Sequence, residues 1–474
     1  MKTLFLSVPY GMSARNFLRS DVFRTLREHC RLVVLTPLAK DPAFLQEFSH
    51  PNATFVAVER NRSLILHKVI ELLAIIQTYF FTKDHPIETL LMLKNQLKKE
   101  NPLRYAAYAA FANTVGRLPV VVRWLETISE RLQRNTVLLA LFEKHRPVLV
   151  FLTHPFVQEE LEIALCARSK NVPALCMVHS WDNLTSKSGL RQLTSPQVGR
   201  VFPASLFERV VVWNEVLAEE LVELYGYPRE RIFLSGIPQF DIYAEAGKMM
   251  SRQQFFSDIG ADPAKKLIYF LATSPFLIHD QTLAVKTLVE ALRKGRFGVE
   301  CQLLIRFHPR TDMSEWAQTF KGADVFFQTP SSAYTLITVP NEWKAEHVRV
   351  DNFAESLLYC DVVINGMSTT SIDAAWFDKP TVCFAFDGDV SNNPMMPVYY
   401  GNTHYKKLLA LEGVRVAWSP AEMIDRVRAY LADPALDAAG RKRIRDRYIY
   451  RLDGKSGDRV ARYLLEFASI ADSR

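Results

Sequence analysis

Residues 232–241 read Ile-Phe-Leu-Ser-Gly-Ile-Pro-Gln-Phe-Asp, and this stretch divides the chain into two halves of similar design. Its apolar start is typical of a last strand, and the glycine and proline end that strand where the chain leaves a domain. Before it, we expect strands at 3–8, 31–36, 148–153, 174–178 and 210–213, alternating with helices. After it, we expect strands at 267–272, 302–307, 324–327, 361–365 and 381–384, again with helices between them. Two such series predict an α/β protein with two doubly wound parallel sheets.

The composition sets the broad class of the protein. With 474 residues, 49% of them hydrophobic and 23% charged, the chain can bury large cores and is not a disordered protein. Its six cysteines show no Cys-x-x-Cys spacing, so we expect buried thiols and not a disulfide framework or a zinc site. The first residues lead into a strand, which argues against a signal peptide.

One helical segment holds the whole excess of positive charge. Residues 60–146 contain 14 Lys and Arg against seven Asp and Glu, while the other 44 basic and 44 acidic residues balance, giving the formal net charge of +7. Within this segment, residues 64–81 are strongly apolar but too short and too charged for a confident transmembrane helix. We consider two interpretations: a buried helix with a solvated basic face, or an interfacial patch that includes Lys94, Lys98 and Lys99 and binds an anionic membrane or glycan.

The loops that follow the strands of the second half favour phosphate binding. Residues 365–373 read Asn-Gly-Met-Ser-Thr-Thr-Ser-Ile-Asp, which places Ser368, Thr369 and Thr370 at the start of a helix. Free backbone N–H groups and the helix dipole attract anions at such a position, although an ordinary helix cap would look similar. The other candidates for binding the donor nucleotide and its phosphates are Asp373 for the ribose, the pair His308 and Arg310 around Pro309, and Ser274.

The loops of the first half are richer in groups that can move a proton. Residues 179–187 read His-Ser-Trp-Asp-Asn-Leu-Thr-Ser-Lys and follow an apolar strand. We take Asp182 as the preferred general base, with His154 and His179 as alternatives. The other candidates for ligand binding at this edge are Gly11, Ser13, Arg15, Trp181 and Lys187.

With these motifs the chain resembles the GT-B glycosyltransferase superfamily. His308-Pro309 and Ser368-Thr369-Thr370 resemble the HP and SS/ST motifs of bacterial enzymes that use CMP- or CDP-activated donors, among them sialyl- and Kdo-type transferases and CDP-glycerol glycerophosphotransferases. Asp453-Gly454-Lys455-Ser456 with Arg459 resembles the turn before the last helix in CDP-glycerol transferases and UDP-N-acetylglucosamine 2-epimerases. The resemblance implies two Rossmann-like domains facing across a cleft: an acceptor domain at 1–235 with the helical insertion at about 60–146, a donor domain at 236–450, and a final helix within 451–474 that packs toward the first domain.

The resemblance also implies an activity. We expect an inverting glycosyltransferase without a metal or other cofactor, which moves a sugar from a CMP-, CDP- or UDP-linked donor to a hydroxyl of a bacterial surface glycan or lipid-linked acceptor, such as a capsule or lipopolysaccharide precursor. It would lie in the cytoplasm, either free or as a peripheral protein on the inner leaflet. The chain departs from the sialyltransferase pattern because its first half has no Asp/Glu-Asp/Glu-Gly triplet.

Three alternatives remain open on the sequence. A glycerophosphotransferase of the CDP-glycerol type differs only in the group that the donor carries. A nucleotide-sugar epimerase or hydrolase would share the scaffold, but residues 371–375, Ser-Ile-Asp-Ala-Ala, lack the Gly-Gly-x-x-Glu-Glu stretch of the epimerases. A non-catalytic subunit could bind the nucleotide sugar without turnover. The basic residues do not alternate with aromatic residues as in a nucleic-acid-binding module, so we do not expect nucleic acid as a partner.

Overall fold

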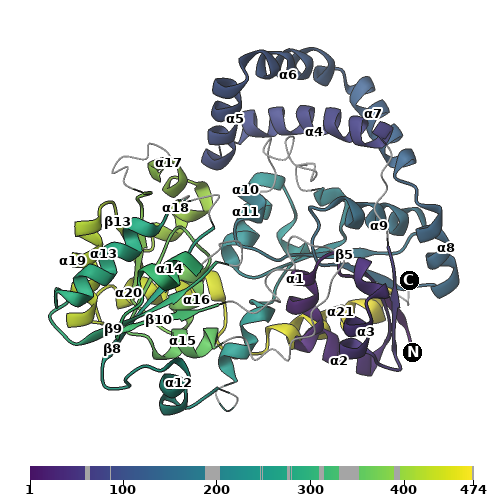
Figure 1. Cartoon of the computed structure of the whole chain (residues 1–474). Coiled ribbons are helices and arrows are strands. Elements are labelled where there is room, and N and C mark those ends of the chain that lie inside the picture. Colours follow the sequence, from purple (N-terminus) through teal and green to yellow (C-terminus); the bar gives the residue numbers. More distant parts are fainter. Residues whose placement is uncertain are drawn as a thin grey trace. The chain divides into compact units, whose positions relative to one another are not determined.

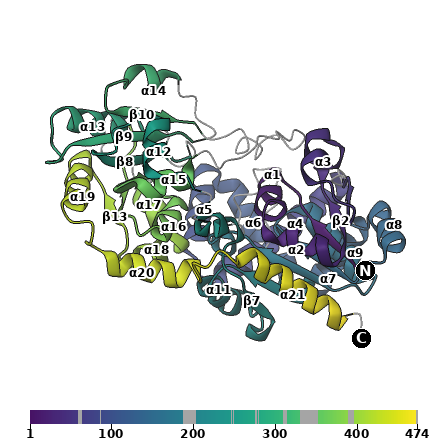
Figure 2. The same cartoon turned by 90° about the horizontal axis from the view of Figure 1, so that it is seen from below.

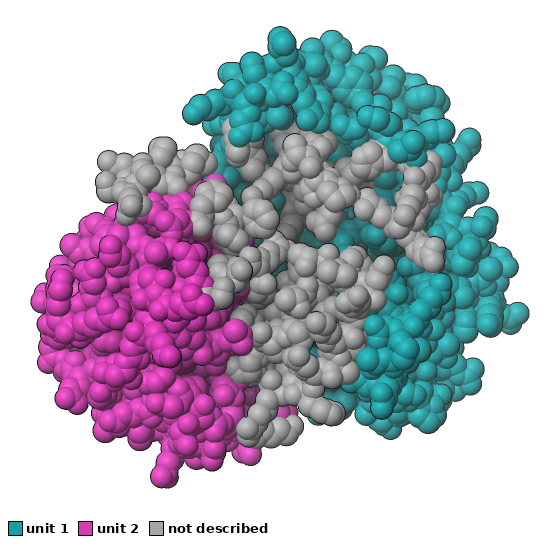
Figure 3. All heavy atoms as spheres, in the orientation of Figure 1, with its two compact units in different colours: residues 1–239, 339–343, 455–474 teal, residues 240–338, 344–454 magenta. Residues whose placement is uncertain are grey.

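The computed structural model describes residues 1–58, 64–85, 87–186, 203–245, 247, 249–274, 278, 280–308, 314–329, 352–388 and 396–471. The chain forms two compact units (Figures 1 and 3). Among the described residues, unit 1 comprises 1–239 and 455–471, and unit 2 comprises the residues between 240 and 454. The chain therefore passes from unit 1 into unit 2 and returns for its last helix.

Unit 1 is built on a parallel sheet of seven strands in the order β3-β2-β1-β4-β5-β6-β7. These strands are β1 (Thr3–Ser7), β2 (Arg31–Leu35), β3 (Ala53–Val56), β4 (Leu149–Leu152), β5 (Ala174–Val178), β6 (Arg209–Val212) and β7 (Ile232–Leu234). The central strands are buried along their whole length, as expected for a sheet covered by helices on both faces. The strand order reverses between β1 and β4, so this is the switch point where ligands of such folds bind.

Unit 2 repeats the same topology with six parallel strands in the order β10-β9-β8-β11-β12-β13. These strands are β8 (Lys266–Leu271), β9 (Cys301–Arg306), β10 (Val325–Gln328), β11 (Val362–Asn365), β12 (Thr381–Phe384) and β13 (Arg415–Ala417). Its switch point lies between β8 and β11. The expectation of an α/β protein with two doubly wound parallel sheets is therefore confirmed.

Helices connect the strands in both units. Unit 1 contains α1 (Gly11–Ser13), α2 (Asp21–His29), α3 (Pro42–Phe48), α4 (Leu64–Asp84), α5 (Glu88–Glu100), α6 (Pro102–Thr114), α7 (Pro119–Leu132), α8 (Thr136–His145), α9 (Gln158–Ser169), α10 (Asn183–Ser186), α11 (Glu215–Tyr225) and α21 (Ser456–Ala471). Unit 2 contains α12 (Arg252–Ile259), α13 (Thr282–Arg293), α14 (Ser314–Thr319), α15 (Phe353–Tyr359), α16 (Thr370–Trp376), α17 (Met396–Tyr400), α18 (Thr403–Leu409), α19 (Pro420–Ala432) and α20 (Ala438–Ile444).

Where the chain returns to unit 1, the last helix packs so closely on residue 236 that only glycine fits there. α21 packs along α2 (Figure 2). Gly236 has a φ of +83°, and a Cβ there would lie 2.6 Å from Ser456 Oγ and 3.1 Å from the Arg459 guanidinium. Arg459 Nε donates to the backbone oxygen of Ser235 over 2.8 Å. The turn at 453–459 thus fastens the last helix to the end of β7.

Two sequence-based expectations about elements were incomplete. The strands β3 and β13 were not predicted, because they are short edge strands whose residues are mostly only half-buried. The helix expected from residue 14 to residue 29 is divided into a π-helical turn at Ala14–Leu18 and α2. Ser20 separates them: its Oγ accepts from the backbone N–H of Val22 and so caps α2. All six cysteines are buried and free, as expected.

The helical segment of unit 1 forms a layer of its own. α4 is long and apolar enough to cross a membrane by length and composition, yet 47% of its most apolar window is buried inside the protein. Leu73 and Ile76 of α4 pack with Leu125 of α7. In Figure 1 α6 lies on the outer side of α4. Packing within this layer accounts for much of the apolar character of α4, as the first interpretation of the segment expects.

Candidate functional site

The carboxyl edge of the sheet in unit 2 brings the predicted phosphate-binding loops together. Ser274 follows β8, His308 follows β9 and Ser368 follows β11, and these strands are neighbours in the sheet. All three residues are half-buried. A Cβ on Gly366 would lie 2.8 Å from the Thr273 side chain, so only glycine lets the loop after β11 approach β8 this closely. Arg310 lies outside the described residues.

A buried network holds the hydroxyl-rich loop of unit 2 in place. Asn365 Nδ2 donates to Thr370 Oγ1 over 3.0 Å and to Ser371 Oγ over 3.2 Å. Cys383 Sγ donates to Asn365 Oδ1 over 3.3 Å, and burial raises the pKa of this thiol to about 11. The hydroxyl of Tyr405 lies 3.2 Å from both Ser371 Oγ and Cys383 Sγ. The hydroxyls of Thr370 and Ser371 are therefore used inside the protein. Ser368 Oγ accepts from the backbone N–H of Thr370 over 3.3 Å, and Ser368 and Thr369 lie half-buried at the start of α16.

Asp373 has a structural partner in unit 2. Its carboxyl is 6% exposed, and its Oδ1 accepts from the Tyr243 hydroxyl over 2.6 Å. Tyr243 is in turn surrounded by Phe240, Trp376 and Phe377. This contact joins α16 to the 3₁₀ segment Pro238–Ala244. The role of Asp373 toward the ribose stays a prediction, and the geometry gives this carboxylate a packing role as well.

At the carboxyl edge of unit 1, two histidines stand side by side. The rings of His154, after β4, and His179, after β5, have centroids 4.4 Å apart. The Tyr10 ring, just before α1, lies 5.7 Å from His154. Three loops around the switch point between β1 and β4 therefore meet at these rings. His179 is buried and His154 half-buried.

Asp182 sits at the start of α10 with both carboxylate oxygens in use. Ser180 Oγ donates to Oδ1 over 2.5 Å, and Ser186 Oγ donates to Oδ2 over 2.6 Å. The two hydroxyls fix the orientation of the carboxylate on a half-buried turn. Trp181 beside it is 3% exposed, so it contributes packing to this loop.

The other predicted acceptor residues lie in the turn after β1. Gly11 and Ser13 form the short helix α1 and are both buried. Arg15, on the π-helical turn, is half-buried, and its Nε donates to Asn16 Oδ1 over 3.0 Å. π-helical turns are rare and often occur at functional sites. Lys187 lies outside the described residues.

Glu160 supports this edge and was missed in the sequence. This fully buried carboxylate, in the first turn of α9, accepts from the backbone N–H groups of Thr153 (3.0 Å) and His154 (2.6 Å). Thr153 Oγ1 bridges to the backbone oxygen of Ser7 across the switch point. Burial raises the pKa of Glu160 to about 8, although the hydrogen bonds act in the opposite direction. An acidic residue in the first turn after β4 was the available signal, but such residues commonly only compensate the helix dipole.

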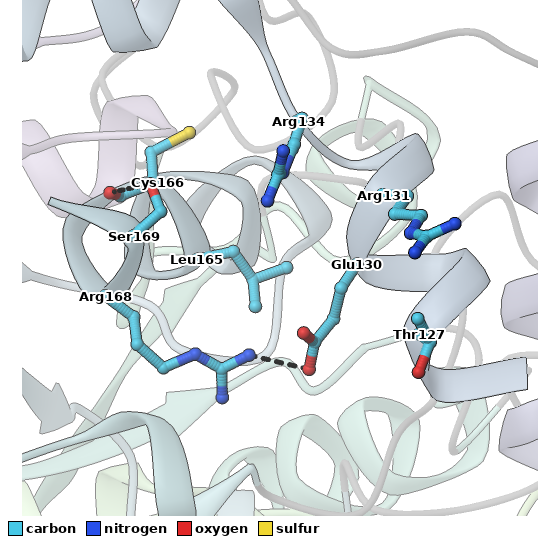
Figure 4. A pocket seen from close by; sticks show the side chains of 8 residues that line it. All are labelled: Thr127, Glu130, Arg131, Arg134, Leu165, Cys166, Arg168 and Ser169. Carbon is cyan, nitrogen blue, oxygen red and sulfur yellow. Dashed lines mark hydrogen bonds and ion pairs between the residues drawn. The ribbon is translucent and has the colours of Figure 1, made fainter. Parts of the chain in front are cut away.

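A cavity of about 420 Å³ in unit 1 lies away from these loops (Figure 4). Its lining comes from the end of α7 and the end of α9, and α9 runs from the carboxyl edge of the sheet to the opposite edge. An ion pair of 2.6 Å between Arg168 and Glu130 spans it. The cavity therefore does not belong to the switch-point site. The lining residues are Thr127, Glu130, Arg131, Arg134, Leu165, Cys166, Arg168 and Ser169.

The described residues contain no group of three or more His, Cys, Asp or Glu that could hold a metal ion. The sequence does contain one Asp-x-Asp triplet, at 387–389. Asp387 Oδ1 accepts from the backbone N–H of Asp280 over 2.7 Å, and the N–H of Gly388 donates to the backbone oxygen of Asp280. These bonds fasten the loop after β12 to the start of α13, and Asp389 lies outside the described residues.

A comparison with protein families finds one match over more than half of the chain. The family model described as CDP-Glycerol:Poly(glycerophosphate) glycerophosphotransferase matches residues 203–466. The matched region contains all described residues of unit 2, together with β6, β7, α11 and most of α21 in unit 1. No curated protein matches the chain.

Solved structures resemble the chain along its whole length. The UDP-GlcNAc 2-epimerase of Neisseria meningitidis bound to UDP-GlcNAc has a TM-score of 0.56 at 12% identity, covering 98% of this chain and 100% of that chain. S. aureus MnaA in a co-structure with UDP has a TM-score of 0.54 at 11% identity, covering 99% and 97%. The wall teichoic acid polymerase TagF soaked with CDPG has a TM-score of 0.51 at 12% identity, covering 100% and 90%. At these identities the structures show the shared GT-B fold alone.

Proposed function

This chain belongs to the CDP-glycerol:poly(glycerophosphate) glycerophosphotransferase family, and from that premise we propose that it transfers a glycerophosphate-type group from a CDP-activated donor to an acceptor hydroxyl. The family supports a transferase that uses a nucleotide-activated donor. The observation that carries the finer proposal is the extent of the match, because it includes the whole described carboxyl edge of unit 2 with its hydroxyl-rich loop.

In the proposed mechanism, unit 2 binds the nucleotide donor. Ser274, His308, Ser368 and Thr369 lie on one sheet edge and can hydrogen-bond phosphate oxygens. The buried network below the loop keeps it from moving when charge develops on the leaving phosphate, and such preorganised donors are the main source of electrostatic stabilisation in group transfer. Catalysis is proposed to need no metal ion.

Unit 1 is proposed to activate the acceptor. Asp182 takes the proton of the acceptor hydroxyl, and the two serine hydroxyls hold its carboxylate in position. The acceptor oxygen forms a bond to the β-phosphorus of the donor, and the bond between that phosphorus and the bridging oxygen breaks. CMP leaves with the bonding electron pair. His154 and His179 are the alternative bases on the same edge.

The identity of the nucleotide product tests this chemistry. Purified protein is incubated with CDP-glycerol and a short glycerophosphate oligomer that ends in a free hydroxyl, and the products are analysed by mass spectrometry. We expect an oligomer one glycerophosphate longer and one CMP for each transfer. Release of CDP, or no extension of any oligomer, would overturn the proposal.

Sugar transfer is the second candidate, because CMP- and CDP-sugar enzymes share the motifs at 308–309 and 368–370. The acceptor oxygen would then attack the anomeric carbon with inversion, and the acceptor would be a surface glycan or lipid-linked precursor. A panel of CMP-, CDP-, UDP- and GDP-sugars under the same assay distinguishes the two reactions. A glycosylated product with inverted anomeric configuration would favour this candidate.

We also propose that the protein works at the cytoplasmic face of a membrane through the outer helix of its helical segment. All exposed residues of α6 are uncharged, and Leu103 among them is 83% exposed. At the start of α7, Val120 is 80% and Trp124 is 61% exposed. Exposed Lys98, Lys99, Arg117 and Arg123 flank these residues in the sequence. Apolar side chains with basic neighbours suit an anionic lipid surface.

Liposome flotation tests this location. We expect the protein to float with vesicles that contain phosphatidylglycerol and to float less with pure phosphatidylcholine. Replacing Leu103, Val120 and Trp124 together by serine should abolish flotation, whereas Val299→Ser, which removes a 44% exposed apolar side chain from unit 2, should not. Equal flotation by both proteins would contradict a membrane contact through α6 and α7.

A further inference from the structure

Two buried polar groups at the carboxyl edge of unit 1 have no hydrogen-bond partner in the described structure. They are Ser13 Oγ and Asn183 Nδ2, and each residue is 1% exposed. Nearly all buried polar groups in proteins are hydrogen-bonded, so an exception needs an explanation. Two exceptions on adjoining loops of one sheet edge point to a shared cause.

The local backbone does not explain these residues. Ser13 is the N-terminal cap of the π-helical turn Ala14–Leu18, and its side chain makes no capping hydrogen bond there. Asn183 is the first residue of α10, but the side-chain bonds of that turn are made by Asp182 with its two serines. Neither side chain therefore caps a helix.

Both groups lie on loops of the same sheet edge as the proposed catalytic residues. Ser13 follows β1 and Asn183 follows β5, on either side of β4 in the sheet. The ring contacts of His154 with Tyr10 (5.7 Å) and with His179 (4.4 Å) join the three loops. Asn183 is also the residue next to Asp182. A ligand that reaches Asp182 would come within the loops that carry both unsatisfied groups.

The chemistry of the two groups indicates what they can bind. An asparagine Nδ2 only donates, whereas a serine hydroxyl donates or accepts, so the ligand must offer oxygen atoms. Both side chains are neutral, and the Asp182 carboxylate lies on the same edge. A negative charge at this edge disfavours a phosphate group. A neutral hydroxyl fits the site better.

We infer that Ser13 and Asn183 form a subsite for the hydroxyl-bearing end of the acceptor, next to the hydroxyl that Asp182 deprotonates. The inference rests on the proposed function. It extends the expectation for Ser13 and adds Asn183, for which the sequence analysis proposed no role. The two groups are satisfied only when the acceptor is bound.

The subsite predicts effects on stability and on acceptor binding that a purely structural role of Ser13 and Asn183 would not produce. If the groups serve only the acceptor, their removal relieves a buried unsatisfied atom, so Ser13→Ala and Asn183→Leu should leave the Tm of the free protein unchanged or raise it. Each variant should raise the acceptor KM by about tenfold, which corresponds to the loss of one hydrogen bond. The affinity for CDP should stay as in the wild type.

Two matched controls have hydrogen-bond partners in the described structure and no proposed role in ligand binding. Ser20 is buried, and its Oγ donates to the backbone oxygen of Phe17 and accepts from the N–H of Val22. Asn52 Nδ2 donates to the backbone oxygen of Arg27 over 2.9 Å. Ser20→Ala and Asn52→Leu should therefore lower the Tm by about 2–4 °C and leave the acceptor KM unchanged.

The experiment measures three quantities for the full chain and these four variants. They are the Tm of the free protein, the rate of oligomer extension with CDP-glycerol, and the Tm shift caused by the glycerophosphate oligomer alone. If the wild type extends the oligomer but both edge variants keep its acceptor KM, the subsite is wrong. If either edge variant loses Tm as the controls do, that side chain is structural and the subsite is wrong.

If the proposed function is wrong, the experiment gives a different result. In that case the wild type does not extend the oligomer, and the extension assay says nothing about Ser13 and Asn183. The subsite is then judged from a panel of neutral polyols, with glycerol as the first probe. A Tm shift by the polyol that Ser13→Ala and Asn183→Leu both lose would support it, and an equal shift in all variants would overturn it.

Discussion

The two switch-point edges use polar groups in opposite ways. At the edge of unit 2, Asn365 connects Thr370, Ser371 and Cys383 in one buried network. At the edge of unit 1, Ser13 and Asn183 are buried without partners within the described residues. A satisfied network holds a loop in one conformation, whereas an unsatisfied buried group lacks a partner that a ligand can supply. This difference agrees with the proposal that unit 2 binds the nucleotide donor and unit 1 the acceptor.

The largest effect should come from removing the proposed base in unit 1. Asp182→Ala should lower turnover by about 10²- to 10⁴-fold, the usual contribution of general base catalysis, and leave CDP binding unchanged. Steady-state kinetics and calorimetric titration with CDP measure the two quantities. Asp41→Ala is the matched control, because Asp41 caps α3 by accepting from the N–H of Phe44. It should lower stability and not turnover, and a similar outcome for Asp182→Ala would assign the base to another residue.

The second prediction concerns the buried acid of unit 1. Burial raises the pKa of Glu160 from its ordinary value of 4.5 to about 8, so the folded protein holds a proton that the unfolded chain has lost between these two pH values. Stability then falls as the pH rises through that window, by an amount on the order of a few kcal/mol. Glu160→Gln removes this titration. The amide nitrogen of the glutamine cannot accept a hydrogen bond, so the side chain loses one bond to the backbone and the variant is less stable than the wild type at pH 5.

Urea unfolding of both proteins between pH 5 and pH 8 measures this effect. The difference in free energy of unfolding between the wild type and Glu160→Gln should shrink as the pH rises, because only the wild type loses stability from this residue. The contributions of the other titrating groups are the same in both proteins, so they cancel in this difference. A difference that stays constant or grows with pH would show that Glu160 is ionised throughout this range, and that its hydrogen bonds to the backbone of Thr153 and His154 outweigh the effect of burial.

The sequence predicted the scaffold better than the roles of its polar residues. Apolar runs identified the central strands, because buried parallel strands leave a strong local pattern, and the loops after these strands supplied the candidate site residues. The functions of Glu160 and Asn365 depend on partners in other segments, such as Thr153 and Cys383. Such contacts leave no local pattern. For the same reason the contact of Asp373 with Tyr243, 130 residues away, was not foreseen.

The third prediction tests the network of unit 2. Asn365→Ala leaves Thr370 Oγ1 and Cys383 Sγ without this partner, and should lower the free energy of unfolding by about 2–3 kcal/mol. It should also raise the KM for the nucleotide donor several-fold, because the loop at 366–370 loses its anchor. Gln302→Ala is the matched control. Gln302 is buried near the start of β9, at the sheet edge opposite to the loop at 366–370, and bonds to the backbone of Asp262. It should cost similar stability without changing that KM, and equal kinetics in both variants would contradict the anchoring role.

The smallest effect is expected at the periphery of the same network. Tyr405→Phe removes a hydroxyl that lies 3.2 Å from both Ser371 Oγ and Cys383 Sγ. Both of these atoms keep Asn365 Oδ1 as a partner, Ser371 Oγ at 3.4 Å and Cys383 Sγ at 3.3 Å. The loss should therefore be about 1 kcal/mol, and the KM for the nucleotide donor should stay within about twofold of the wild type. Chemical unfolding and donor kinetics measure the two effects. A rise in KM as large as that of Asn365→Ala would make Tyr405 the main anchor of the loop, and the rigidity of this edge would then come from α18 and not from the end of β11.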